Sequence, residues 1–150
     1  MIRTAFCALM LACALTAPGL ADAARVEALA TRIAPEAERR ADLYKSAPAA
    51  PADTPAPGDA LLADLTDFAL AARALSQEIE ASGGPQDLRC IFRGMSGDVT
   101  DRITALDAAQ TRADLSRAYI EIARLAGQAQ RIASDPELAA QSAPEPCMGE

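Results

Sequence analysis

The segment PQDLRCIFRGMSGD, residues 85–98, holds the side chains of this sequence that are best suited to binding chemistry. Arg89 and Arg93 are spaced i,i+4, so on a helix they would share one face. Phe92 and Met95 would lie beside them. Two guanidinium groups next to an aromatic ring and a thioether could form the lip of a small pocket for an anionic ligand or a partner protein. We therefore take Arg89, Phe92, Arg93 and Met95 as candidate contact residues.

The same segment also fits a structural corner between two helices. In that interpretation Leu88, Ile91 and Phe92 fill the core, and Gly94 and Gly97 make the turn. The corner explains the composition of the segment more simply, and the pocket is kept as the alternative.

This chain lacks many of the residues and motifs that catalysis commonly uses. The sequence contains no histidine, which removes the commonest general base and the commonest metal ligand. It also has no CxxCH sequence for haem, no cysteine cluster and no glycine-rich phosphate loop. We therefore predict that the protein is not an enzyme and that it has no catalytic residues, no cofactor and no metal site.

The first 23 residues have the pattern of an export signal. Arg3 precedes an apolar run from Ala5 to Leu15, and Ala21-Asp22-Ala23 has the small-x-small form that signal peptidase reads. The run is shorter than the roughly 20 residues that span a bilayer. We expect cleavage after Ala23, with cleavage after Ala21 as the alternative.

A lipoprotein signal ending at Cys13 is a weaker interpretation, because Leu11 fits the expected pattern poorly. The mature chain is expected to be exported, to the periplasm if the cell is bacterial, and to have no membrane span.

Removal of the leader leaves two cysteines, Cys90 and Cys147. Two cysteines in an exported chain are most simply one disulfide. Such a bridge would stabilise the fold by about 4 kcal/mol in the chain-entropy model. A mixed disulfide with a partner through Cys147 is the alternative.

The charge of the chain narrows the class of partner. The net charge of −7 disfavours nucleic acid, whose phosphates require a basic face, and anionic lipid surfaces. Arg117, Arg124 and Arg131 recur every seven residues, with Glu121 near two of them. This spacing is typical of an exposed helix face carrying ion pairs, and a stripe for an anionic partner is the alternative.

Apolar spacing predicts helices throughout the mature chain. We expect an N-terminal amphipathic helix over 24–45, interrupted or kinked at Pro35, and an Ala/Pro-rich linker over 46–58. A helical domain should occupy 59–133, and a tail held by the disulfide should occupy 134–150.

Local signals divide the helical domain. Asp59 caps a helix whose seam runs from Leu61 to Ile79, and Gly83-Gly84-Pro85 ends it. A short helix then runs to Arg93, and Gly94 to Gly97 break it. Thr111 and Asp114 form a capping box, so 98–133 is more readily two helices than one.

Together these patterns predict an all-α fold, a small helical bundle with a looser N-terminal helix on a Pro-rich linker and one disulfide. They favour a small exported protein that acts through contact with an unidentified protein partner. The alternative is a binder of small anionic ligands with a cleft near Arg89, Phe92 and Arg93.

The intact mass of the protein from its exported fraction, measured without reductant, tests the processing and the bridge together. We expect the mass of a chain that begins at Ala24 and lacks two hydrogens. A heavier mass, carrying a lipid or a disulfide-linked adduct, would point to Cys13 or Cys147 instead.

Overall fold

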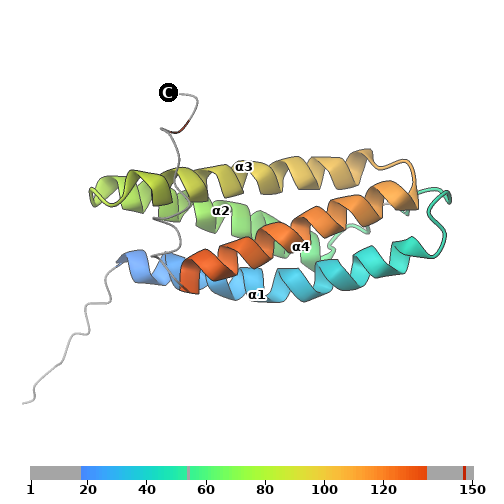
Figure 1. Cartoon of the computed structure of the whole chain (residues 1–150), viewed down its shortest axis with the longest axis horizontal. Helices are drawn as coiled ribbons and strands as arrows, with labels where there is room; N and C mark the ends of the chain where they lie inside the picture. The colour runs from blue at the N-terminus through green and yellow to red at the C-terminus, as the bar shows by residue number, and fades with distance from the viewer. Residues whose placement is uncertain (1–17, 54, 135–146, 148–150) are drawn as a thin grey trace, which may run out of the picture.

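The computed structural model describes residues 18–53, 55–134 and 147. Four helices run alongside one another, as Figure 1 shows: α1 (Pro18–Lys45), α2 (Ala60–Ala81), α3 (Gln86–Ala108) and α4 (Arg112–Ser134). Each packs against its neighbours in sequence, and α1 also packs against α4, which closes the bundle. The prediction of an all-α bundle is confirmed.

Two sequence expectations fall mainly outside this description. Residues 1–17 of the predicted leader, and the predicted tail apart from Ser134 and Cys147, lie outside the described residues. None of the described helices combines the length and the apolar character needed to cross a membrane.

The second helix follows its sequence signals closely. The Asp59 carboxylate accepts hydrogen bonds from the amides of Leu61 and Leu62, at 2.9 and 3.2 Å, which satisfies two of the donors left open at a helix start. The predicted seam faces the core, with these members buried: Leu61, Leu65, Phe68, Ala72 and Leu75. Gly83 then adopts a φ of +67°, which ends the helix at the predicted place.

The predicted break at Gly94 to Gly97 is wrong, because α3 continues through both glycines to Ala108. A glycine inside a helix costs roughly 1 kcal/mol relative to alanine, which weakens a helix without ending it. Phe92, Met95 and Val99 lie on one side of this helix and are all buried. Their burial outweighs the cost of the glycines, so packing decides the helix here.

The division of residues 98–133 into two helices is confirmed, with the break between Ala108 and Arg112. The capping box forms as predicted: the Thr111 amide donates to the Asp114 carboxylate at 3.1 Å, and the Asp114 amide donates to the Thr111 hydroxyl at 3.2 Å.

The expectation of a loosely attached N-terminal helix does not hold. Helix α1 has its most extensive contacts with α4, and it contributes these residues to the common core: Val26, Leu29, Ala30, Ile33, Ala37 and Ala41. It does not restart at Pro35. Spacing alone showed the apolar stripe of α1 but not that the stripe packs into the bundle.

The Ala/Pro-rich segment after α1 is likewise not a free spacer. Its carbonyl groups face the start of α4, where Pro48 accepts from the Ala113 amide at 3.0 Å and Ala50 accepts from the Arg112 amide at 2.9 Å. The Ala52 amide donates to Gln110 at 3.0 Å. The segment thus satisfies helix-end donors of α4 that have no partner within the helix.

A charged group inside the bundle links three helices at one end. The Arg40 guanidinium of α1 donates to the Asp59 carboxylate at 2.7 Å, to Glu36 at 2.8 Å and to the Tyr119 hydroxyl of α4 at 3.3 Å. The Arg40 and Asp59 side chains are only 17% and 13% exposed. Since a charge is costly to bury unless it is paired and hydrogen-bonded, these contacts are what make Arg40 tolerable there.

The carboxylates around Arg40 remain ionised to low pH. Hydrogen bonds from Arg39 and then Arg40 lower the pKa of Glu36 to about 2. Burial raises the pKa of Asp59, but hydrogen bonds from Arg40 and from the Leu62 and Leu61 amides outweigh it, so the net shift is downward.

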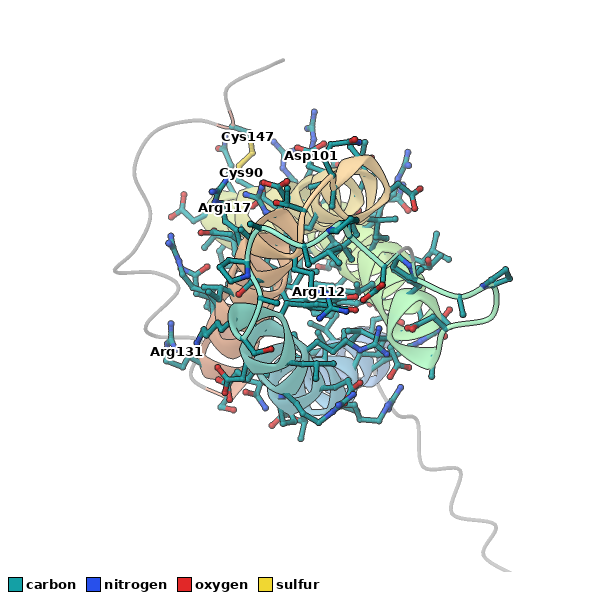
Figure 2. The ribbon with its side chains drawn as sticks, turned by 90° about the vertical axis from the view of Figure 1, so that its right-hand side faces the viewer. Cys90, Asp101, Arg112, Arg117, Arg131 and Cys147 are labelled. Carbon is teal, nitrogen blue, oxygen red and sulfur yellow. A yellow bond between two sulfur atoms is a disulfide. The ribbon has the colours of Figure 1, made fainter. Side chains whose placement is uncertain are left out.

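Aromatic stacking extends this network toward the start of α4. The rings of Tyr44 and Tyr119 are nearly parallel, with centroids 5.9 Å apart. Arg40 lies over the Tyr119 ring and Arg112 lies over the Tyr44 ring, at 5.7 and 5.9 Å from the ring centroids. Figure 2 shows Arg112 near the middle of this end of the bundle.

Replacing Asp59 separates its two roles. Asp59→Asn keeps an oxygen for the amides of α2 but removes the negative charge beside Arg40, and we expect a loss of about 1–2 kcal/mol in the free energy of unfolding. Asp59→Ala also removes the cap and should cost about 1 kcal/mol more. Urea denaturation with the disulfide intact measures both, and an Asn variant as stable as the original would show that the ion pair contributes nothing.

Candidate functional site

The four residues predicted to form one contact site do not form one. Phe92 and Met95 are buried, at 4% and 7% exposure, and pack in the core. They are therefore not available as an apolar lip next to the arginines. The burial of Phe92 agrees with the structural interpretation of this segment, but the corner that it placed at Gly94 and Gly97 does not form.

The two arginines of the predicted site lie on the side of α3 that borders α2. Arg89 is largely covered and donates to Glu80 of α2 at 2.8 Å. Arg93 is exposed and lines a polar groove of about 560 Å³ between α2 and α3, together with Arg73, Gln77 and Thr100. Any anionic ligand here would meet Arg93 and Arg73 rather than Arg93 and Phe92.

The predicted disulfide is confirmed. Cys90 of α3 is bonded to Cys147, with the two Cα atoms 5.4 Å apart, as Figure 2 shows at the edge of the bundle. The bond links α3 to a residue that follows α4 in the chain. Among the neighbouring helix pairs, α3 and α4 have the fewest contacts.

A groove accompanies this sparse packing. It has a volume of about 440 Å³ and is lined by Cys90, Ile91 and Met95 of α3 and by Arg131 and Ile132 of α4. Its walls mix apolar and charged side chains, and this mixture does not indicate a particular ligand.

The most distinctive surface is the outer side of the α1–α4 pair, which we call the α1–α4 face. It comprises Glu38, Asp42 and Lys45 of α1 and Arg117, Ile120, Arg124 and Arg131 of α4. Ile120 is 45% exposed. It lies between two shallow grooves of about 510 and 310 Å³, and it lines both.

Charge on this face is only partly neutralised within the chain. Arg117 approaches Asp114 at 3.9 Å, and Lys45 contacts Asp42 at 2.6 Å. Within the described part of the chain, Glu38, Arg124 and Arg131 form no ion pair. The expectation of a face laced with ion pairs through Glu121 is therefore not met there, and Figure 2 shows Arg117 and Arg131 on the same side of the molecule.

Small residues form the floor between the charges. Ala41, Ala123 and Gly127 line the larger groove, and a Cβ added at Gly127 would meet only the Arg131 side chain, at 3.8 Å. A partner could therefore approach the backbone of α4 closely. Sequence reasoning found the arginine spacing but missed Ile120 and Glu38, because spacing within one helix does not show which helix lies beside it.

No group of three or more acidic or cysteine side chains is placed to hold a metal ion in the part of the chain that is described. No protein-family model, curated protein or solved structure matches the chain. The contacts within this structure are therefore the basis for assigning a role to each residue.

Replacing both cysteines by serine tests the contribution of the bridge. The bond closes a loop with a sequence separation of 57 residues, and its loss should lower the free energy of unfolding by about 4 kcal/mol, since the unfolded chain regains loop entropy. Equilibrium urea denaturation measures the change. The original protein reduced with a dithiol should give the same midpoint as the double variant, and an unchanged midpoint in both would rule out a stabilising bridge.

Proposed function

We propose that this is a small exported helical protein without catalytic activity, which binds another protein through its α1–α4 face. The observation that carries the proposal is Ile120, an apolar side chain left 45% exposed among three arginines. Interfaces commonly place apolar contact at the centre and charge at the rim, with arginine enriched.

The position of this face in the bundle supports the same function. Helices α1 and α4 have the most extensive contacts of any pair, and the Tyr44–Tyr119 stack lies between them. A surface carried by two tightly packed helices changes little on binding, so less conformational entropy is lost when a partner is bound.

Two features support export. The leader pattern over residues 1–23 is one, and the Cys90–Cys147 bond is the other, because structural disulfides persist in oxidising compartments. Cleavage after Ala23 would keep the buried residues of α1 from Val26 onward. The mature helix would therefore retain the side chains that pack it into the bundle.

The anionic-ligand alternative is less well supported than protein contact. Its aromatic and thioether groups, Phe92 and Met95, are buried in the core. What remains of it is the polar groove with Arg73 and Arg93, in which acidic side chains, Glu80 and Asp101, also lie.

A photo-crosslinking side chain at position 120 tests the proposed function in the exported fraction. We expect an adduct with a second protein at position 120 and none from the same side chain at position 70. Leu70 is a suitable control because it is 60% exposed and lies on α2, away from this face.

Arg124→Glu in the position-120 protein should reduce the adduct by about tenfold, since a reversed charge at the rim repels the acidic group that meets Arg124 on the partner. Equal adducts from positions 120 and 70, or an adduct indifferent to Arg124→Glu, would contradict a specific contact at this face.

A further inference from the structure

The α1–α4 face carries opposite charges on its two helices. Glu38 and Asp42 lie on α1, spaced i,i+4, and Arg117 and Arg124 lie on α4, spaced i,i+7. Lys45 of α1 already pairs with Asp42, so among the described residues the charges of this face without an ion pair include acidic Glu38 on α1 and basic Arg124 on α4. A partner of a single sign would satisfy only one of them.

The charges of opposite sign are also at matching heights along the bundle. The two helices are antiparallel, with Gln130 bonded to Thr31, and Ser116 bonded to the Ala41 carbonyl. Glu38 and Asp42 of α1 are thus level with the stretch of α4 from Arg117 to Arg124. The offset between Glu38 and Arg124 is less than about one helical turn, 5.4 Å.

From this arrangement we propose that the partner bound by the α1–α4 face is a second copy of this chain. In the dimer, a twofold axis runs parallel to the helices within the plane of the face. It places α1 of one copy over α4 of the other and preserves the heights. Glu38 then faces Arg124 of the second copy, and Asp42 faces Arg117, and each pair occurs twice.

The centre of the face suits the same arrangement. Ile120 lies between the grooves near the axis, so the two copies of Ile120 cover each other's exposed surface. Ala41, Ala123 and Gly127 line the larger groove and allow close approach. Glu38 and Arg124, which form no ion pair among the described residues, gain one across the dimer.

This inference rests on the proposed function, because it names the protein that the α1–α4 face binds. Its test is an exchange of charges between the two helices, followed by sedimentation velocity on the oxidised full chain. Arg124→Glu sets two acidic groups opposite each other in both symmetry-related pairs, and Glu38→Arg sets two basic groups opposite each other. Each single variant should weaken dimerisation by about 100-fold, since each creates two like-charge contacts at once.

The decisive sample is an equimolar mixture of the two single variants. In a mixed dimer the acidic side chain introduced by Arg124→Glu in one chain would face the basic side chain introduced by Glu38→Arg in the other. The second pair keeps its original residues, so dimerisation should return. The double variant Glu38→Arg with Arg124→Glu should also dimerise by itself. Arg73→Glu is the matched control, because Arg73 is exposed on α2, and it should leave dimerisation unchanged.

Far-ultraviolet circular dichroism verifies that each variant is folded. A monomeric original protein at the highest soluble concentration would overturn the proposal, and so would a mixture of folded single variants that stays monomeric. A monomer whose position 120 still crosslinks to a different protein would refute the dimer and leave the proposed function standing. A dimer that follows the charge exchange, with crosslinks at position 120 only to its own copy, would support the dimer and refute a separate partner.

Discussion

The end of the bundle where α1 ends and α2 begins depends on Arg40. This arginine belongs to α1, it donates to Asp59, the cap of α2, at 2.7 Å, and it donates to the Tyr119 hydroxyl of α4 at 3.3 Å. A buried guanidinium is stable only when all of these groups are in place, so the position of each helix end is set by the others. The Tyr44–Tyr119 stack leads to Arg112, which lies over the Tyr44 ring. Arg112 in turn donates to Asp53 in the segment that precedes α2.

The pair formed by α3 and α4 differs from the other three helix pairs. No comparable polar network joins α3 to α4 in the described chain, and their packing is the sparsest. The Cys90–Cys147 bond joins α3 to a residue that lies beyond the end of α4 in the chain. A polar network thus fixes one end of the bundle, and a covalent bond anchors Cys90 of α3. Helices α1 and α4 are the most extensively packed pair, and this pair carries the α1–α4 face.

Local signals in the sequence were sufficient to predict where most helices begin and end, but not how the helices pack against one another. Asp59, the Thr111–Asp114 box and the seam from Leu61 were predictable, because caps and periodicity act within a few residues. The break at Gly94 was mispredicted because the burial of Phe92 and Val99 depends on another helix. The contact of Pro48 with α4 and the pairing of Arg40 with Asp59 join distant parts of the chain. Phe92 and Met95 were grouped with Arg93 for the same reason, whereas both are buried in the core.

Self-association must overcome a net charge of −7 on each copy. Repulsion between net charges acts over the whole molecule, and at physiological ionic strength it is screened beyond a Debye length of about 8 Å. In the proposed dimer, the pairs of Glu38 with Arg124 would act at much shorter range beside a buried Ile120, so salt would weaken them less. Screening therefore reduces the opposing term more than the pairs that favour the proposed dimer. An acidic protein can in this way keep its solubility and still bind its own copy through one mixed-charge face.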